Sequence, residues 1–176
     1  MKPRIAIDMD EVIADALSGY LERYREEFRI ELVRADLTGK KVYDVVQAEH
    51  REAVRAYPVA EAFFRNLRAI EGSQDVIREL GEHYEIFIAT AAMEFPTSFV
   101  AKFEWLQEHF SFVSPLNIVF CGDKSILAAD YLIDDHARHF KNFRGEGILY
   151  SAPHNAAETG YRRVDSWQDV RALFLG

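Results

Sequence analysis

Short apolar runs alternate with longer amphipathic stretches along most of the chain. The amphipathic stretches place apolar side chains at three- and four-residue intervals, the spacing of an α-helix with one buried face. The apolar runs have the length of strands that are buried on both faces of a parallel sheet. The runs are residues 5–7, 84–89, 117–120, 131–133 and 147–150, and the helical stretches are 12–28, 72–80, 99–110 and the segment that starts at Ser166. This alternation predicts an α/β fold with a Rossmann-like parallel sheet flanked by helices.

Two of the helical stretches carry more specific signals. In the stretch 99–110, the apolar residues Phe99, Phe103, Leu106 and Phe110 follow the helical period and are expected to form its buried face. The last helix is expected to begin at Ser166, because Asp169 stands three residues later in the arrangement of a capping box.

The segment between the first strand and the next strand–helix unit is too long for a simple crossover. It is more polar and irregular than the rest of the chain, with a loop at Gly39-Lys40-Lys41 and short helical stretches at 49–57 and 60–68. We therefore expect a core formed by residues 1–15 and 72–176 and a small helical cap formed by residues 16–71.

Polar side chains follow four of the predicted strands at the point where each strand ends. The carboxyl ends of parallel strands meet at one edge of the sheet, where open α/β sheets bind their ligands. The first strand is followed by Asp8 and Asp10, two residues apart. Two carboxylates this close repel each other unless a cation lies between them, which favours a Mg²⁺ site. A nucleophilic carboxylate, a second acid, a hydroxyl and an ammonium group are together the set required for phosphoryl transfer. The residues concerned are Asp8, Asp10, Thr90, Lys124, Asp134 and Asp135.

Composition narrows the class of protein further. The chain has 176 residues, a formal net charge of −8 and a single cysteine, Cys121. The acidic balance argues against binding to a nucleic-acid polymer, which needs a basic surface. One cysteine excludes an internal disulfide and suits a reducing compartment. No stretch has the length and hydropathy of a signal peptide or a membrane span. We expect a cytoplasmic protein with a small phosphorylated partner, and the sequence leaves both monomer and homodimer open.

The motifs resemble those of the haloacid-dehalogenase superfamily of phosphatases. That superfamily has D-x-D-x-[VT], a Thr or Ser after the second strand, a Lys and a late acidic pair. The stretches IAIDMDEVIAD, EIFIATAAM and CGDKSILAADYLIDD are similar to the 5′(3′)-deoxyribonucleotidase family, and the match spans nearly the whole chain. The resemblance implies a Mg²⁺-dependent phosphomonoesterase with a helical cap inserted after the first strand.

The resemblance also assigns a role to each residue of the predicted edge. Asp8 is the expected nucleophile that forms an aspartyl-phosphate, and Asp10 is the expected general acid and base. Asp8, the backbone carbonyl of Asp10 and Asp134 are the expected Mg²⁺ ligands, and Asp135 is expected to orient Lys124 or a metal-bound water. Phosphoryl oxygens are expected to contact Thr90, Lys124 and the backbone N–H groups near Met9, Asp10 and Ala91.

The substrate implied by the resemblance is a nucleoside monophosphate. The cap aromatics that stack on the nucleobase in the family align with Lys40 and Lys41 here. Tyr43 and Phe63 are therefore the expected replacements, with Phe64 beside them, although both Phe residues fit the core of the cap equally well. A phosphatase for another small phosphate such as a sugar phosphate, or a catalytically silent phosphate-binding module, would use the same scaffold.

Four further positions leave questions open. Glu11 stands where the family usually has Gly, and Ala91 replaces a Ser or Thr that would offer a hydroxyl to the phosphate. His136 and His139 flank the acidic pair and suggest the alternative of a histidine-bound Zn²⁺ or Fe²⁺.

Overall fold

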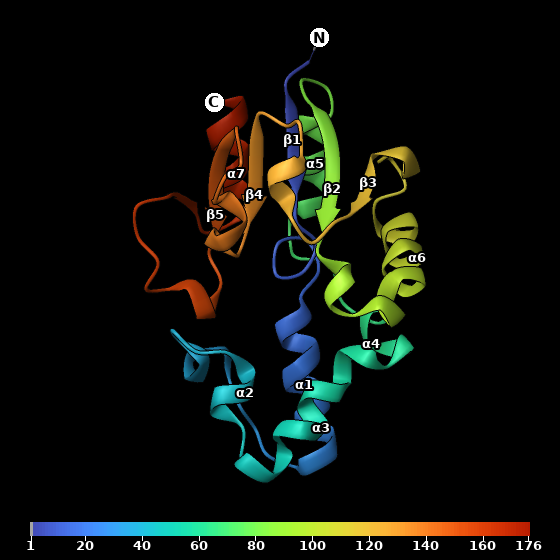
Figure 1. Ribbon diagram of the computed structural model, residues 1–176, viewed down its shortest axis with the longest axis vertical. Coiled ribbons are helices and arrows are strands. Elements are labelled where there is room, and N and C mark those ends of the chain that lie inside the picture. Colours follow the sequence, from blue (N-terminus) through green and yellow to red (C-terminus); the bar gives the residue numbers. More distant parts are fainter. Residues whose placement is uncertain (1) are drawn as a thin grey trace.

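The core of the molecule is one parallel sheet, shown in Figure 1. A computed structural model describes residues 2–176. Six strands lie in the order β3-β2-β1-β4-β5-β6, and every adjacent pair is parallel. The strands are β1 (Arg4–Ile7), β2 (Glu85–Thr90), β3 (Ile118–Phe120), β4 (Tyr131–Asp134), β5 (Glu146–Tyr150) and β6 (Arg162–Val164). The predicted α/β fold with a parallel sheet is therefore confirmed, and β6 is an additional strand that the sequence pattern did not predict.

The central position of β1 decides where the site forms. Ile7 lies opposite Ile88 of β2 on one side and Ile133 of β4 on the other. The residues that follow these three positions therefore leave the sheet side by side at its carboxyl edge. Sequence segments that are about 80 and 125 residues away from β1 are brought next to it in this way.

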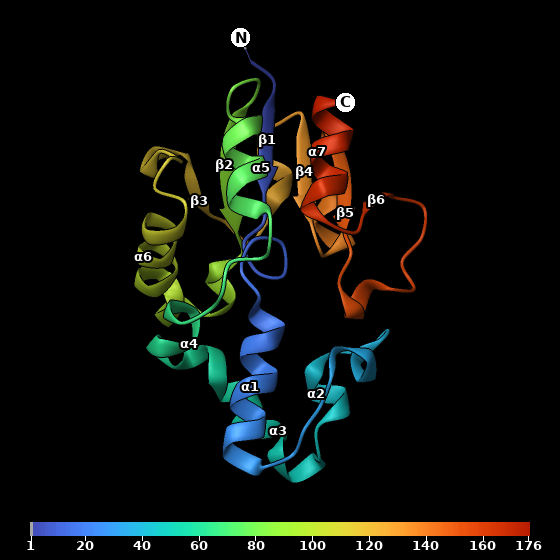
Figure 2. The same cartoon turned by 180° about the vertical axis from the view of Figure 1, so that it is seen from behind.

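The two faces of the sheet are covered differently. Helices α5 (Ser73–Leu80) and α7 (Trp167–Leu175) pack together over one face, as Figure 2 shows. Ile5 and Ile7 point into the larger core on that side, whereas Ala6 belongs to a second, smaller cluster. That smaller cluster lies under the loop of residues 137–143. Ile5, Ala6 and Ile7 point alternately to the two faces because successive side chains of a strand lie on opposite sides of the sheet.

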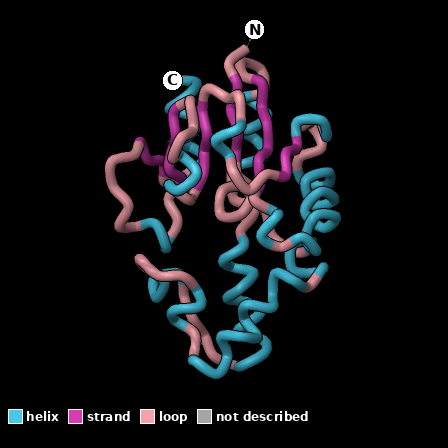
Figure 3. The backbone as a smooth tube through the Cα atoms, viewed as in Figure 1, coloured by secondary structure: helices cyan, strands magenta, loops and turns pink. Residues whose placement is uncertain are grey.

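The segment 16–71 consists of helices and connecting turns and lies beyond the carboxyl edge of the sheet (Figures 1 and 3). Its α-helices are α1 (Ala16–Phe28), α2 (Val42–Val45), α3 (Arg51–Ala56) and α4 (Glu61–Arg65). The expected helices at 49–57 and 60–68 correspond to α3 and α4, with 3₁₀ turns on both sides of α3. None of the helices in residues 2–176 has the length and apolar run that a membrane crossing requires.

The first helix begins later than the hydrophobic period suggests. The prediction that it starts at Val12 is wrong, because α1 begins at Ala16. Val12, Ile13 and Ala14 are completely buried in a turn, where their apolar side chains complete the core. Asp15 then caps α1, its carboxylate accepting a hydrogen bond of 3.0 Å from the backbone N–H of Ser18.

The buried face of α6 (Phe99–His109) also differs from the prediction. Phe103 is 38% exposed, whereas Ala101, Lys102, Trp105 and Leu106 are buried. Leu106 and Phe110 are buried as predicted, and Ala101, Lys102 and Trp105 complete the buried face in place of Phe103. A lysine can occupy it because, as described below, its ammonium group is paired with a carboxylate. By contrast, α7 is capped by Ser166 as predicted, with the N–H of Asp169 donating to its hydroxyl.

Candidate active site

The first group at the carboxyl edge is a lysine held between two carboxylates. The Lys124 ammonium lies 2.5 Å from an oxygen of Asp8 and 2.5 Å from an oxygen of Asp134. Asp8 follows β1 and Asp134 ends β4, so the two carboxylates are neighbours because their strands are paired. The side chain of Lys124 has no exposed surface. Burial alone would lower its pKa, but these two carboxylates raise it above the usual value for a lysine. The lysine is thus a fixed positive charge beside Asp8.

A second buried lysine, Lys102, was not predicted from the sequence. Its ammonium donates to an oxygen of Asp10 over 2.5 Å and to the hydroxyl of Thr90 over 3.2 Å. It also lies 4.4 Å from the centre of the Phe64 ring in α4, a distance suited to a cation–π contact. The signal that could have identified it is the apolar stripe of Ala101, Trp105 and Leu106, in which Lys102 is the only charged member.

The acidic groups of the site outnumber the two lysines. Asp8, Asp134 and Asp135 offer carboxylate oxygens that lie within 4.8 Å of one another. Burial raises the pKa of all three carboxyl groups, most strongly that of Asp135, whose neighbours Asp134 and Asp8 raise it further. Such crowding is relieved by a cation, and oxygen donors of this kind suit a hard divalent ion. The residues present therefore fit the metal that the resemblance implies.

Several polar groups of the turn after β1 have no partner among residues 2–176. The buried Oδ1 oxygen of Asp10 makes no hydrogen bond with any described residue. The backbone N–H groups of Met9 and Asp10 likewise donate to no carbonyl in residues 2–176, although the Met9 carbonyl accepts from Ile13 and Ala14. Unused buried polar groups are rare in native proteins and call for an explanation. The two N–H groups can donate to phosphate oxygens, and the Asp10 carboxyl group can exchange a proton with the oxygen that joins the phosphate to its alcohol.

A cavity of about 270 Å³ lies between this edge and the helical segment. On the side of the sheet its walls include Asp8, Asp10, Ala91 and Asp135. On the other side its walls include the predicted base-contact residues Tyr43 and Phe63, together with Tyr20, Phe64, Lys40 and Lys41. The predicted contact residue Met9 is completely buried and is not part of the cavity wall. The predicted residues Asp8, Asp10, Ala91, Asp135, Tyr43 and Phe63 thus line one cavity, whereas Thr90, Lys124 and Asp134 are buried outside its wall.

The aromatic side chains in the cavity wall also pack against one another. The hydroxyl groups of Tyr20 and Tyr43 are 2.9 Å apart, and the rings of Tyr20 and Phe63 meet edge to face with centres 4.8 Å apart. Phe63 is only 6% exposed and Phe64 only 2%. Both functions weighed from the sequence, core of the helical segment and wall of the substrate cavity, therefore fit the same side chains.

Glu11 connects the core to the helical segment. Its backbone is left-handed, with φ of 58°, a conformation that glycine adopts readily and most other residues avoid. Its carboxylate accepts a hydrogen bond from the N–H of Leu17 over 2.5 Å and pairs with Arg34 over 2.9 Å. Arg34 also pairs with Asp15 over 2.8 Å. Glu11 thus binds the segment that follows it, while it also lines the cavity beside Asp8 and Asp10.

The burial of Glu11 leads to a prediction about stability and pH. Burial raises its pKa from 4.5 to about 7, although Arg34 acts in the opposite direction. The folded state therefore binds a proton that the unfolded chain releases, so this contribution to stability is complete below pH 4.5 and is lost as the pH rises through about 7. In EDTA, Glu11→Gln should remove that loss, which is about 3 kcal/mol at most.

Urea unfolding of both proteins at pH 5 and pH 8 measures the difference. Glu146→Gln, which alters an exposed carboxylate on β5, is the control and should follow the original protein. Equal pH dependence in Glu11→Gln and the original protein would show that Glu11 is ionised in the folded state throughout.

A second prediction concerns Lys102. Lys102→Met should lower kcat/KM by about 10²- to 10³-fold, because it removes a buried cation from between Asp10 and Thr90. Lys102→Arg keeps the charge and should retain more activity, and Lys141→Met, an exposed lysine, is the control. Steady-state kinetics measures the effect, on variants whose thermal unfolding shows that they are folded. A kcat/KM of Lys102→Met within threefold of that of the control would contradict this role.

Comparisons with known proteins agree with this geometry. A family model described as 5′ nucleotidase, deoxy (pyrimidine), cytosolic type C protein matches residues 2–176. The chain belongs to this nucleotidase family. A 5′(3′)-deoxyribonucleotidase of Bacillus subtilis is 39% identical over 178 residues, covering 99% of this chain and all of that protein. A Staphylococcus epidermidis protein provisionally named for the same activity is 44% identical over 173 residues, covering 98% and 96% of the two chains.

Solved structures show the same fold at low sequence identity. A haloacid-dehalogenase family hydrolase of Deinococcus radiodurans, solved with bound phosphate and sodium, has a TM-score of 0.67 at 13% identity. The match covers 98% of this chain and 94% of that one. Together with the family membership, this identifies the chain as a hydrolase of phosphate monoesters with the haloacid-dehalogenase fold.

Proposed function

We propose that this enzyme hydrolyses deoxyribonucleoside monophosphates, with Mg²⁺ as its metal and an aspartyl-phosphate on Asp8 as its intermediate. The observation that carries the proposal is the placement of Asp8. Its carboxylate opens into the cavity, with Lys124 on one side and the turn bearing Asp10 on the other. The substrate class follows from the relative named 5′(3′)-deoxyribonucleotidase, which matches over its whole length.

In the first step a carboxylate oxygen of Asp8 attacks the phosphorus atom. The bond from phosphorus to the nucleoside oxygen breaks, and Asp10 gives that oxygen a proton as the alcohol leaves. Burial raises the pKa of Asp10, against the opposing effect of Lys102, which helps it hold the proton that this step requires. We assign this proton transfer to the Oδ1 atom of Asp10, which makes no hydrogen bond with any described residue.

In the second step a water molecule attacks the phosphorus atom of the aspartyl-phosphate. Asp10, now ionised, accepts a proton from the water, the bond between phosphorus and the Asp8 oxygen breaks, and inorganic phosphate is released. Lys124 and Lys102, with the Thr90 hydroxyl and the amides of Met9 and Asp10, bind the phosphoryl oxygens throughout. Mg²⁺, held by the Asp8 and Asp134 carboxylates and the Asp10 carbonyl, would supply additional positive charge to those oxygens.

The segment 16–71 is proposed to act as the cap of a core formed by residues 1–15 and 72–176. Contacts between the two parts include the Arg34 pairs and a backbone hydrogen bond of 2.8 Å from Gly39 to Pro153. Tyr43 and Phe63 are proposed to contact the base or sugar of the nucleotide, because they line the cavity opposite Asp8. Cytoplasmic location and the choice between monomer and homodimer stay predictions.

The test is phosphate release from deoxy- and ribonucleoside 5′- and 3′-monophosphates and from sugar phosphates, each with Mg²⁺ and with EDTA. We expect Mg²⁺-dependent hydrolysis with a preference for the deoxynucleotides. A preference for sugar phosphates would reject the nucleotide substrate and keep the mechanism. Full activity in EDTA would reject the metal, and no release from any compound would favour a silent phosphate-binding module.

A further inference from the structure

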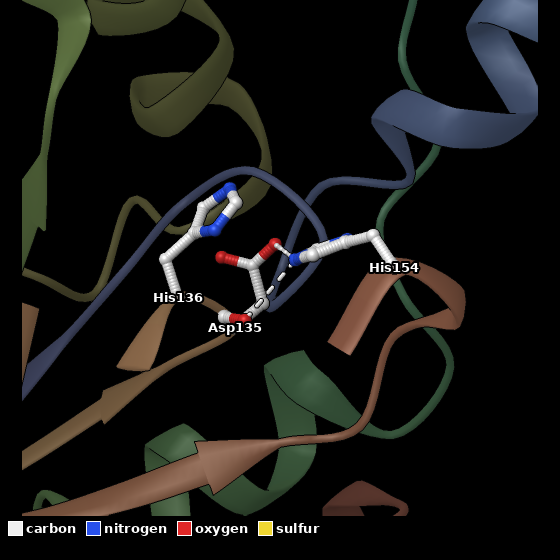
Figure 4. Close-up of side chains that lie close together, drawn as sticks. All are labelled: Asp135, His136 and His154. Atoms are coloured by element: carbon white, nitrogen blue, oxygen red, sulfur yellow. Dashed lines mark hydrogen bonds and ion pairs between the residues drawn. The ribbon is translucent and has the colours of Figure 1, made fainter. Parts of the chain in front are cut away.

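Beside the proposed Mg²⁺ ligands lies a second group of donor atoms, formed by Asp135, His136 and His154. One ligand atom from each of the three residues lies within 4.8 Å of the other two. Figure 4 shows the Asp135 carboxylate beside the two imidazole rings. Asp135 and His136 follow β4, and His154 lies in the loop after β5, so the pairing of these strands brings the three residues together. Among the histidines near the acidic pair, His154 is closer to His136 than His139 is, with ring centres 4.4 Å and 6.4 Å apart.

We propose that Asp135, His136 and His154 form a binding site for a borderline divalent cation such as Zn²⁺, separate from the Mg²⁺ site. Two imidazoles and one carboxylate are a donor set that such ions prefer over Mg²⁺. The Nε2 atom of His154 lies 3.5 Å from a carboxylate oxygen of Asp135. Two ligands of one tetrahedral Zn²⁺ lie roughly 3.4 Å apart, so this pair already has the spacing that a bound ion needs.

The Asp135 carboxylate has capacity to bind a cation. It is buried, and none of the described residues donates a hydrogen bond to it. The His154 Nε2 atom lies 3.5 Å from one of its oxygens and 3.2 Å from the Asp135 backbone carbonyl. Because Asp135 also belongs to the group with Asp8 and Asp134, its two oxygens can serve two neighbouring cations. A buried carboxylate without donors is costly unless a cation occupies the site.

The loop that carries His154 is fixed in place. The Asn155 side chain donates to the backbone carbonyls of Asp135 and Tyr150, each over 2.8 Å. Arg163 in turn donates to the Asn155 side-chain oxygen over 2.9 Å. These bonds join the end of β4 to the loop after β5, so the ligand positions exist before an ion arrives.

The site is also accessible, since all three residues line the cavity beneath the helical segment. Water or a substrate oxygen can therefore complete the coordination of a bound ion. Lys41 and Arg138 line the same cavity, and their charges oppose a cation there. Lys41→Ala should consequently strengthen Zn²⁺ binding, while loss of either imidazole should weaken it.

The test is Zn²⁺ binding by calorimetry to the full chain, with Mg²⁺ in large excess so that the carboxylate group is filled. We expect one Zn²⁺ per chain, with an affinity that falls by about 10- to 100-fold in His136→Ala and in His154→Ala. His83→Ala, which changes an exposed histidine just before β2, is the control and should bind as the original protein does. Visible absorption of Co²⁺ should report imidazole coordination and be lost in the same two variants.

Equal Zn²⁺ affinity in the double variant His136→Ala/His154→Ala and in the control would overturn the proposal. So would Zn²⁺ that is displaced stoichiometrically by Mg²⁺, because the ion would then occupy the carboxylate group instead. These outcomes do not depend on turnover, so a failure here is distinct from a failure of the proposed function. If the Zn²⁺ site and the proposed phosphatase activity are both present, bound Zn²⁺ should inhibit hydrolysis by occupying Asp135 and part of the cavity. His154→Ala should then relieve that inhibition.

Discussion

Asp8→Asn should abolish phosphate release, with kcat reduced by at least about 10⁴-fold. The amide is a poor nucleophile toward phosphorus, and no other carboxylate of the edge lies between the Lys124 ammonium and the cavity as Asp8 does. The substitution should not unfold the protein. It removes one of three crowded carboxylates, and the burial that raises the pKa of Asp8 shows that its charge is costly in the folded state.

The measurement is steady-state phosphate release together with thermal unfolding of the same sample. Asp75→Asn changes a carboxylate on α5 whose side chain is 89% exposed, and it should match the original protein in both assays. A folded Asp8→Asn variant that keeps more than a tenth of the original kcat would show that Asp8 is not the nucleophile.

Lys124→Met should have the second largest effect, because Lys124 neutralises two buried carboxylates at once. Its ammonium lies 2.5 Å from both Asp8 and Asp134. Removal of one partner from a buried ion pair costs about 3–5 kcal/mol, so the variant should unfold at a much lower temperature than the original protein in EDTA. Mg²⁺ should restore part of that loss, since a cation between the carboxylates replaces the missing charge. Turnover should fall by about 10³-fold even with Mg²⁺.

Thermal unfolding with EDTA and with Mg²⁺ separates these effects. Mg²⁺ should raise the Tm of Lys124→Met by more than it raises that of the original protein or of Lys141→Met. If Lys124→Met does not fold in EDTA, Lys124→Arg provides the comparison, since it keeps the charge. A Tm of Lys124→Met in EDTA equal to that of the control would contradict the role of Lys124 as the shared counterion.

The position of Asp8, Asp10, Thr90 and Asp134 at the carboxyl edge of the sheet is predictable from the sequence, because these residues end or closely follow strands. An apolar run that ends in Asp8 or Thr90 fixes which end of the sheet the side chain occupies, and the parallel order then brings those ends together. The sheet's outer strand β6 was missed because Arg162–Val164 is short and carries two arginines, so it lacks the apolar pattern of a buried strand.

The residues that the sequence does not reveal depend on tertiary contacts. A lysine in a helix is usually exposed, and the burial of Lys102 is explained only by its pairing with Asp10 and Thr90. Glu11 adopts a left-handed backbone that its residue type disfavours, and its two bonds to Leu17 and Arg34 hold it there. His154 lies 18 residues beyond His136, so no local spacing suggests that the two rings are neighbours.

The most direct test of the mechanism is the mass of Asp10→Asn after mixing with an aryl phosphate and Mg²⁺. The good leaving group needs no proton from Asp10, so Asp8 should still be phosphorylated, whereas the water that must follow lacks its base. We predict that the intact protein gains the mass of one phosphoryl group, that hydroxylamine removes it, and that the peptide containing Asp8 carries it. A folded Asp10→Asn variant that gains no phosphoryl group, or gains it on a peptide without Asp8, would contradict the aspartyl-phosphate mechanism.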